Sequence, residues 1–394
     1  MRIVGTFSGI GGLELPFHER GHEPMLLCDN WAPSQQVLAD RFGGVDIVGD
    51  IHELAETGLP SGVELLTVGF PCTDLSQAGR KAGIGGSESG LVRQVFRILE
   101  THPSVSWLVL ENVRNMLVLD GGQAMRFLTE SLNALGFRWA YRLVDSRFTG
   151  VPQRRHRVIL VATRGLADDP RRVLFADEAG EPDHADGAHL RPDAFGFYWT
   201  EGLRGLGWAV DAVPPLKGGS SVGIPSPPGI WVPGAPLGRR IIVPDIEHAE
   251  LLQGFARGWT KAAELGGRNS PRWKLVGNAV TADVGRWLVS RLEVPGDPVV
   301  ENSPTNPVGR RWPPAAWGDS GGSWTVDAST WPLRGDYQHL LDIVDVDEAA
   351  PLSARGAAGF LSRLVRSSLN RPVEFDRDMR EHIGALAVQP SLIG

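Results

Sequence analysis

A cysteine at the end of an apolar run is the first residue of this sequence that could do chemistry. Cys72 ends the segment Gly69-Phe70-Pro71-Cys72, which closes the apolar run Leu65–Phe70. A thiolate is a strong nucleophile, and α/β folds bind their ligands at the carboxyl ends of sheet strands. The alternative is a small buried hydrophobe, the usual role of a lone cysteine. The Gly- and Ser-rich residues 73–90 that follow are expected to form a mobile lid.

A carboxyl group follows a second apolar run. Glu111 begins the segment Glu111-Asn112-Val113, directly after Trp107–Leu110. A carboxyl that emerges from an apolar strand is partly desolvated, which raises its pKa and makes Glu111 a candidate proton donor near neutral pH. A turn or helix-capping acid is the alternative interpretation.

A glycine-rich turn, Phe7-Ser8-Gly9-Ile10-Gly11-Gly12, lies between a predicted strand and a predicted helix. Glycines permit positive φ and allow a ligand to approach the backbone at a helix N-terminus. Acids follow the next two predicted strands: Asp29 could bind a ribose diol and Asp50 could meet an adenine edge. Together the three positions predict a nucleoside site, with an ordinary tight turn and solvated acids as the alternative.

Arginines gather in the segment Gln153-Arg154-Arg155-His156-Arg157, and residues 147–164 contain five arginines and no acid. In a strand, Arg155 and Arg157 would face the same side. Two guanidinium groups on one face suit a phosphate, a carbonyl or a carboxylate. A solvated edge strand is the alternative.

A late motif, Gly277-Asn278-Ala279-Val280, is expected to open a helix. By itself it indicates no more than an Asn helix cap. It lies within residues 253–292, which hold seven basic residues and two acids. This is a second candidate for a locally basic surface.

The elements that must position these residues alternate between strand and helix. The alternation of continuous apolar strands with helical patterns predicts an α/β fold with a doubly wound, mostly parallel sheet. The predicted strands are Arg2–Phe7, Pro24–Cys28, Leu65–Phe70 and Trp107–Leu110, and the predicted helices are Gly12–Arg20, Ala32–Phe42, Gly90–Glu100 and Gln123–Leu135. A hairpin of Phe137–Val144 and Arg157–Thr163 is expected at one edge.

The composition changes after residue 164. Residues 165–201 hold nine acids and three arginines, and residues 213–238 hold sixteen Pro, Gly or Ser in 26 positions. Such stretches form loops or short strands, so a small irregular domain is expected over residues 165–238.

This small domain would interrupt a larger one of residues 1–164 and 239–293. Residues 294–394 are then expected to be a linker and a C-terminal extension, with a helical pattern around Leu352–Leu369.

The overall charge and the cysteine count exclude several classes of protein. A formal net charge of −7 over 394 residues excludes a globally basic nucleic-acid coat, although a local basic groove is allowed. Cys28 and Cys72 alone allow neither a disulfide framework nor a cysteine-based zinc cluster, and no metal is expected. The sequence shows neither a signal-peptide pattern nor an apolar run of membrane-spanning length, so a cytoplasmic setting is expected.

In this order, the motifs make the sequence similar to the DNA cytosine-5 methyltransferase family of bacterial or phage type. The resemblance covers about residues 1–292 and rests on FSGIGG, Asp29, Asp50-Ile51, GFPC, ENV, QRRHR and GNAV. It implies an S-adenosyl-L-methionine-dependent α/β domain with a target-recognition domain inserted between QRRHR and GNAV.

The resemblance implies a role for each matching residue. Double-stranded DNA would be the substrate, and Cys72 would add to C6 of a flipped-out cytosine while Glu111 bonds or protonates N3. Arg155 and Arg157 would hold the cytosine carbonyl and the neighbouring backbone. The residues implied to bind S-adenosyl-L-methionine are Phe7, Gly9, Gly11, Gly12, Asp29, Asn30, Asp50, Ile51, Phe70, Pro71, Asn278 and Ala279.

Three features depart from the family pattern. Asn30 follows Asp29, where a larger apolar residue often contacts adenine. Thr73-Asp74-Leu75-Ser76 replaces the commoner Gln-Pro-Phe-Ser after the cysteine, which is expected to alter lid packing. About a hundred residues follow the GNAV helix, as a packing appendage or as a module that contacts DNA or a partner. They include Trp312, Trp317, Trp324 and Trp331.

Two other functions compete with a DNA methyltransferase. One is the same chemistry on RNA, and the other is a non-catalytic DNA-binding homologue. The long insert before GNAV favours DNA, because reading a duplex site needs such a module. A cognate restriction endonuclease is a candidate partner, no membrane partner is expected, and the chain is expected to be a monomer.

Overall fold

The computed structural model of the chain has two compact units. The structure describes residues 1–70, 90–165, 167–182, 189–203, 205–219, 225–264, 270–300, 302–304 and 311–387. Unit 1 consists of Met1–Thr149, His156–Glu181 and Ala279–Gly335. Unit 2 consists of Gly150–Arg155, Pro182–Asn278 and Asp336–Gly394.

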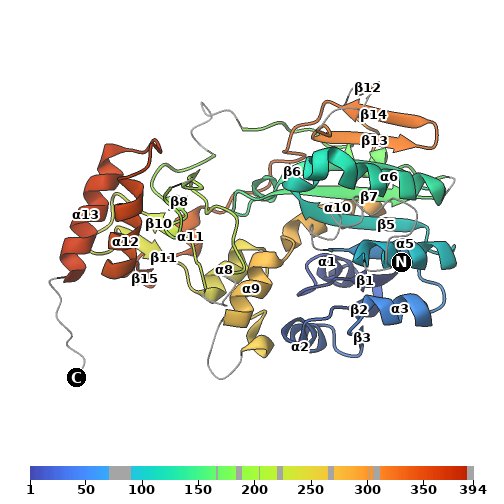
Figure 1. Ribbon diagram of the computed structural model, residues 1–394, viewed down its shortest axis with the longest axis horizontal. Coiled ribbons are helices and arrows are strands. Elements are labelled where there is room, and N and C mark those ends of the chain that lie inside the picture. Colours follow the sequence, from blue (N-terminus) through green and yellow to red (C-terminus); the bar gives the residue numbers. More distant parts are fainter. Residues whose placement is uncertain are drawn as a thin grey trace. The chain divides into compact units, whose positions relative to one another are not determined.

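Unit 1 is built on a ten-stranded sheet with the order β12-β14-β13-β6-β7-β5-β4-β1-β2-β3 (Figure 1). The strands β3, β2, β1, β4 and β5 pair in parallel, and the pairs from β5 to β12 are antiparallel. The predicted α/β fold with a doubly wound, mostly parallel sheet is confirmed for the central strands β3 to β5, to which antiparallel strands are added beyond β5. The strands are β1 (Arg2–Thr6), β2 (Glu23–Cys28), β3 (Asp46–Val48), β4 (Leu65–Val68), β5 (Trp107–Val113), β6 (Arg138–Asp145), β7 (His156–Thr163), β12 (Asn302–Pro304), β13 (Ala315–Asp319) and β14 (Gly322–Val326).

Helices cover both faces of this sheet, which is why its strands are apolar on both sides. The apolar cluster that contains Val4 lies between one face of the sheet and α3, α5 and α6. The cluster that contains Ile3 lies between the other face and α1, α7 and α10. The helices are α1 (Glu14–Glu19), α2 (Ala32–Arg41), α3 (Ile51–Thr57), α5 (Leu91–Thr101), α6 (Gln123–Ala134), α7 (Arg171–Leu174) and α10 (Ala282–Glu293), with short turns η1 (Arg114–Leu117), η2 (Leu119–Gly122) and η3 (Ser146–Thr149).

The predicted hairpin is present as β6 and β7, but it does not form the edge of the sheet. β13 pairs with β6, and β14 and β12 follow outward. These strands come from residues expected to be linker and extension. The turn Asp319-Ser320-Gly321-Gly322 joins β13 to β14, and Trp317 stacks on Trp324 with ring centroids 4.1 Å apart. This aromatic pair stabilises the hairpin.

Unit 2 contains a five-stranded antiparallel sheet with the order β15-β11-β10-β8-β9. Its strands are β8 (Phe195–Phe197), β9 (Ala209–Val210), β10 (Gly229–Trp231), β11 (Ile241–Val243) and β15 (Ala350–Pro351). Its helices are α8 (Ile246–Leu252), α9 (Ser270–Asn278), α11 (Leu340–Ile343), α12 (Ala354–Leu364) and α13 (Val373–Ala387), with the turn η4 (Lys261–Ala263).

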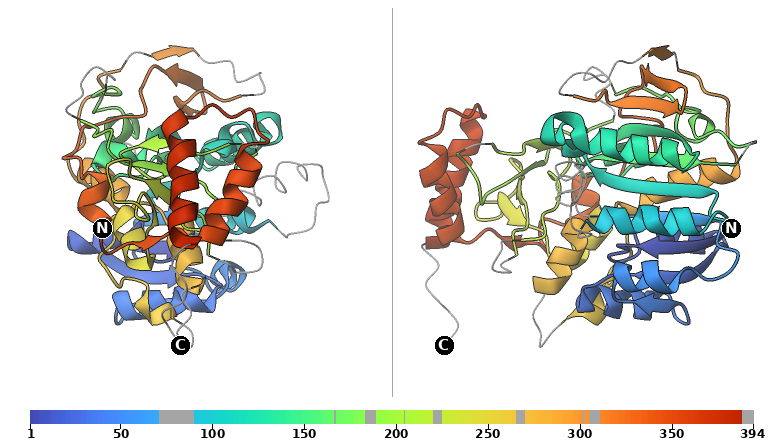
Figure 2. Two further views of the ribbon diagram at one scale, coloured as in Figure 1. Left: turned by 90° about the vertical axis from the view of Figure 1, so that its left-hand side faces the viewer. Right: turned by 45° about the vertical axis from the view of Figure 1, so that its right-hand side comes forward.

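The C-terminal helices are part of the core of unit 2. α12 and α13 lie side by side, as the red helices of Figure 2 show. Phe360 and Phe375 from these helices are fully buried in one cluster with Phe197 of β8 and Trp231 of β10. The C-terminal residues therefore complete the core that the preceding strands begin.

The units divide the chain differently from the predicted domains. Residues 239–278, expected in the larger domain, lie in unit 2 because α8 and α9 pack around Ile230 and Ile242. The residues after 294 are shared between the two units: 294–335 add strands to the sheet of unit 1, and 336–394 belong to unit 2.

Candidate active site

The strand order of unit 1 reverses at β1, which is flanked by β2 and β4. Segments that leave β1 and β4 therefore emerge next to each other, and the Gly69 N–H donates to the Thr6 carbonyl at 3.2 Å. Open α/β sheets bind ligands at such a reversal, outside the carboxyl ends of the strands. The predicted glycine turn follows β1, and the predicted Gly69–Cys72 segment follows β4.

The glycine turn begins with a strained residue. Phe7 has φ +54°, a left-handed conformation that costs a non-glycine residue about 1–2 kcal/mol. Its ring meets the ring of Phe70 in a T-shaped arrangement, with centroids 6.4 Å apart. The structure thus brings together two of the predicted cofactor-binding residues, from the ends of β1 and β4.

The three glycines of the turn have different surroundings. A Cβ on Gly11 would lie 2.4 Å from the Phe42 ring, and a Cβ on Gly12 would lie 2.6 Å from the Val280 carbonyl oxygen. These two glycines allow close packing inside unit 1. Gly9 has φ +57°, and no described atom lies within 4 Å of where its Cβ would stand. Gly9 is therefore the turn residue beside open space that a ligand could occupy.

Asp29 fixes this turn. Its Oδ2 accepts a hydrogen bond from the Gly9 N–H at 2.9 Å, and its Oδ1 accepts one from the Trp31 N–H at 3.0 Å. Burial raises the pKa of the Asp29 carboxyl above its ordinary value. Asp29 therefore holds Gly9 in place from the end of β2. The next residue, Asn30, is exposed.

Asp50 caps α3 after β3. Its Oδ1 accepts a hydrogen bond from the His52 N–H at 2.8 Å, which lowers the pKa of its carboxyl. The side chain is exposed, so it is available to a ligand at the same edge of the sheet. Ile51 behaves differently, because it is buried in the core of unit 1.

Glu111 forms an ion pair at the end of β5. The Arg157 Nε lies 2.7 Å from Glu111 Oε1, and both side chains are largely buried. β5 and β7 are antiparallel neighbours, with Val113 opposite Arg157. The sequence predicted a desolvated acid at position 111, and the structure adds a guanidinium that orients it.

Asn112, to which the sequence analysis gave no role, links β5 to the end of β4. It is buried, and its Nδ2 donates to the Phe70 carbonyl at 2.9 Å. The Val113 N–H donates to Asn112 Oδ1 at 2.8 Å, which fixes the amide. Asn112 therefore anchors the backbone two residues before Cys72. Its place between Glu111 and Val113 in the ENV motif was the signal that could have revealed this role.

Arg155 does not share a strand face with Arg157, contrary to the prediction. β7 begins at His156, and Arg155 lies in unit 2. Its buried guanidinium donates to the carbonyls of Leu216 at 3.2 Å and Gly277 at 3.1 Å. Within unit 2, Arg155 therefore connects the segment at Leu216 to the end of α9.

Gln153, to which the sequence analysis also gave no role, makes hydrogen bonds in the same part of unit 2 as Arg155. Its Oε1 accepts from the Leu216 N–H at 2.9 Å, and its Nε2 donates to the Leu252 carbonyl at 2.8 Å. The amide is fully buried. The first residue of the QRRHR motif thus joins two segments of unit 2.

The GNAV motif ends a helix, whereas the sequence predicted that it opens one. Gly277 and Asn278 close α9 in unit 2, and Ala279 and Val280 belong to unit 1, where α10 begins at Ala282. Ala279 is buried and Asn278 is exposed. The contact of Val280 with Gly12 places the second half of the motif against the glycine turn.

Several predicted residues lie outside the described part of the chain. They are Pro71, Cys72 and the expected lid residues 73–89. The other cysteine, Cys28, is buried in the core, where burial first and then the charges of Asp29 and Asp50 raise the pKa of its thiol to about 12. Cys28 is therefore unsuited to be a nucleophile.

Several arginines of the two basic stretches form ion pairs with acids of the chain itself. Such ion pairs offset positive charge that the sequence alone assigns to a basic surface. The pairs are Arg147–Asp145, Arg157–Glu111, Arg272–Glu250, Arg286–Glu19 and Arg291–Asp177.

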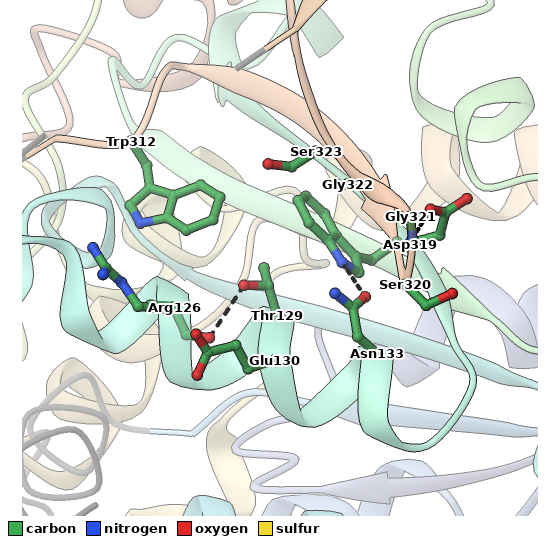
Figure 3. Close-up of a pocket in the computed structure, with 11 residues that line it drawn as sticks. Arg126, Thr129, Glu130, Asn133, Trp312, Asp319, Ser320, Gly321, Gly322 and Ser323 are labelled. Carbon is green, nitrogen blue, oxygen red and sulfur yellow. Dashed lines mark hydrogen bonds between the residues drawn. The ribbon is translucent and has the colours of Figure 1, made fainter. Parts of the chain in front are cut away.

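A separate cavity of about 360 Å³ lies in unit 1, between α6 and the β13–β14 turn (Figure 3). Trp312 and Arg126 are among its lining residues. In the strand order, three strands lie between β6 and β1 and four between β13 and β1, so this cavity is not part of the glycine-turn site.

No group of three or more His, Cys, Asp or Glu side chains in the described ranges could hold a metal ion. No helix among the same residues has the length and apolar character needed to cross a bilayer.

The fold is that of a methyltransferase. The structure resembles the Dnmt2 methyltransferase of S. pombe with a TM-score of 0.52 and 14% identity, over 74% of this chain and 98% of that chain. It also resembles the Entamoeba histolytica methyltransferase EhMeth with a TM-score of 0.50 and 12% identity, over 74% of this chain and 97% of that one.

The sequence comparisons identify the family. The profile of the C-5 cytosine-specific DNA methylase family matches residues 1–177. The chain is 44% identical over 385 residues to the type II methyltransferase M2.BsuMI of Bacillus subtilis (strain 168), covering 95% of this chain and 96% of that protein. It is 29% identical over 184 residues to M.BsuFI of Bacillus subtilis, covering 47% of this chain and 44% of that protein. The chain therefore belongs to the DNA cytosine-5 methyltransferase family.

Proposed function

We propose that this chain transfers a methyl group from S-adenosyl-L-methionine to C5 of a cytosine in a specific duplex DNA sequence, through a covalent bond between Cys72 and C6. The observation that carries this proposal is the Glu111–Arg157 ion pair at the end of β5, whose neighbour Asn112 anchors the segment leading to Cys72. A nucleophile and an oriented carboxyl on adjacent strand ends are what the reaction requires.

The chemistry follows from the weak nucleophilicity of cytosine C5. Addition of the Cys72 thiolate to C6 moves electron density toward C5 and N3. Glu111 stabilises the negative charge at N3 by hydrogen bonding to N3 or by protonating it. Arg157 orients Glu111 and adds a donor for the base. After the methyl group is on C5, the C5 proton passes to a water molecule, the N3 proton returns to Glu111, and elimination of the Cys72 thiolate restores the aromatic ring. The base must leave the duplex for this, at a cost of a few kcal/mol.

The residues present fit the cofactor. Gly9 borders open space at the strand-order reversal, Asp29 fixes that glycine, and the exposed Asp50 follows the next strand. Phe7 and Phe70 supply aromatic surface at the same edge. S-adenosyl-L-methionine, when bound there, supplies the methyl group from its sulfonium. Gly11, Gly12 and Ile51 would not contact the cofactor but would hold the glycine turn and the start of α3 in place by packing in unit 1.

Unit 2 would read the DNA sequence. It contains residues 182–276 of the stretch between QRRHR and GNAV, where the family resemblance implies a target-recognition domain, and Arg155 and Gln153 connect its segments. Arg155 would then act by holding this unit together. The chain would work as a monomer in the cytoplasm of a bacterium or a phage-infected host, alongside a cognate restriction endonuclease.

A methyl-incorporation assay tests the proposal. The protein is expected to transfer tritiated methyl groups to duplex DNA, bisulfite sequencing should place them at one cytosine of a recurring sequence, and DNA carrying 5-fluorocytosine should trap a covalent adduct. Cys72→Ser should abolish both transfer and trapping. Incorporation into tRNA alone would favour the RNA alternative, and no incorporation with intact DNA binding would favour a non-catalytic homologue.

A further inference from the structure

A carboxyl group is buried beneath the glycine turn. Glu14, the first residue of α1, is only 1% exposed. Its Oε1 accepts a hydrogen bond from the Thr67 hydroxyl of β4 at 2.6 Å. Gly5 of β1 makes room for it, because a Cβ there would lie 2.5 Å from that oxygen. The end of β1 is therefore shaped around a buried acid that the proposed mechanism does not use.

The Ser8 hydroxyl lies beside this carboxyl. Ser8 Oγ and Glu14 Oε2 are both buried, and a hydrogen bond from Ser8 favours the ionised form of the Glu14 carboxyl, as the one from Thr67 does. The Ser8 oxygen would also lie 2.5 Å from a Cβ on Gly5, so it is next to the carboxyl. Ser8 is the turn residue between Phe7 and Gly9. Ionising a carboxyl that is buried this deeply costs free energy, which calls for a functional explanation.

The charge around Glu14 is negative. Burial first, and the nearby Asp29 charge in addition, raise the pKa of Glu14 to about 7, although the Thr67 hydrogen bond opposes the shift. Gly5 and Thr67 bring no charge. α10, which packs on α1, carries Asp283 and Arg286, whose side chains pair at 2.6 Å.

Arg286 also pairs with the exposed Glu19. No basic side chain among the described residues forms an ion pair with Glu14. Among the described residues, neither the Glu14 nor the Asp29 carboxyl at the glycine turn forms an ion pair with a basic side chain.

We propose that Glu14 is a positioning residue that recognises the charge of the cofactor: with Asp29, its carboxylate favours S-adenosyl-L-methionine over the demethylated product. This inference rests on the proposed function. Loss of the methyl group converts a sulfonium cation into a neutral thioether. A carboxylate in a buried, poorly screened position senses that difference without touching the sulfur. The product is then released more easily than the substrate cofactor.

Cofactor binding is expected to be coupled to the release of a proton from Glu14. A cation in the site stabilises the ionised form of Glu14, which is half protonated near pH 7 in the empty protein. Binding of S-adenosyl-L-methionine at pH 7 therefore releases part of a proton from Glu14. Binding of the product, which carries the same amino and carboxyl groups but no sulfonium charge, releases less.

Isothermal titration calorimetry on the full-length protein tests both statements. Titrations of S-adenosyl-L-methionine and of S-adenosyl-L-homocysteine, in two buffers of different ionisation enthalpy, give each affinity and each proton release. In Glu14→Gln, the preference for the cation is expected to fall by about three- to tenfold, and the difference in proton release between the two ligands is expected to disappear.

Two further variants control for structure. Glu56→Gln removes an exposed acid from α3, where solvent screens the charge, and should leave the preference unchanged. Thr67→Val keeps the Glu14 carboxyl but removes its donor, so the pH at which the affinity for the cation changes should move upward. This variant decides the question if Glu14→Gln does not fold.

The outcomes separate this inference from the proposed function. If the wild-type protein binds neither ligand, the proposed cofactor is wrong. If it binds both, and Glu14→Gln keeps the wild-type preference and proton release, only the role given to Glu14 is overturned.

Discussion

Arg157 and Glu111 form an ion pair across the neighbouring antiparallel strands β7 and β5, with 2.7 Å between Arg157 Nε and Glu111 Oε1. Arg157→Ala leaves the carboxyl without its partner, so kcat is expected to fall by about 100-fold or more. The free energy of unfolding should fall by about 3 kcal/mol, because both groups are largely buried. Arg147→Ala breaks a comparable pair with Asp145 and is the matched control. Equal activity losses in the two variants would contradict a catalytic role for Arg157.

Asn112→Ala should uncouple the end of β4 from β5. The variant loses the hydrogen bond to the Phe70 carbonyl, so the backbone before Cys72 is no longer held. We expect kcat to fall at least tenfold while the Kd for S-adenosyl-L-methionine changes little. The free energy of unfolding should drop by about 1–3 kcal/mol, as for other buried hydrogen bonds that lose one partner. Stopped-flow methyl transfer together with ligand titration separates the two effects, and a purely structural role would change stability alone.

Gly9→Ala and Gly11→Ala should fail in different ways. At Gly11, a Cβ would lie 2.4 Å from the Phe42 ring at φ +82°, so the variant should be strongly destabilised. At Gly9 the space is open, so the variant should lose only about 1–2 kcal/mol of stability from its positive φ. Gly9→Ala should nevertheless bind the cofactor more weakly than the wild-type protein does. Thermal unfolding and ligand titration measure both, and Phe42→Ala should partly rescue Gly11→Ala but not Gly9→Ala.

These glycines show what residue type can and cannot predict. The motif predicted a turn after β1, and the structure has that turn. The prediction succeeded because a strand that is buried on both faces gives a continuous apolar run, which is easy to recognise in a sequence. The motif could not show that Gly11 and Gly12 face Phe42 and Val280, because those contacts join distant segments of the chain.

The prediction that Arg155 and Arg157 share a strand face is wrong for a related reason. The alternation rule holds only inside a strand, and the chain passes from unit 2 to unit 1 between Arg155 and His156. No local pattern marks that boundary. The β13–β14 hairpin was also missed, because proline-rich surroundings hide a short pair of strands whose stability comes from the contact of Trp317 with Trp324.

Glu14→Gln should stabilise the protein at alkaline pH. Burial raises the pKa of Glu14 from 4.5 to about 7, so between these values the native state holds a proton that the unfolded chain has lost. Stability contributed by this group therefore falls as the pH rises from 4.5 to 7, and above pH 7 the cost is about 3 kcal/mol. Gln keeps an acceptor for Thr67 and has no such cost. Urea unfolding at pH 5 and pH 8 should show a variant advantage that grows with pH, and a constant difference would contradict the assignment.

Phe375→Ala tests whether the C-terminal helices belong to the recognition unit. Phe375 is fully buried, with its ring centroid 5.0 Å from that of Phe197 and 5.3 Å from that of Trp231. Its truncation should cost about 3–5 kcal/mol and weaken binding to duplex DNA. The Kd for S-adenosyl-L-methionine should stay near the wild-type value, because the glycine turn lies in unit 1. Val373→Ala, on the same helix but 81% exposed, is the control. If Phe375→Ala is destabilised yet binds its DNA site with wild-type affinity, α13 is only an appendage and the site-reading surface does not depend on it.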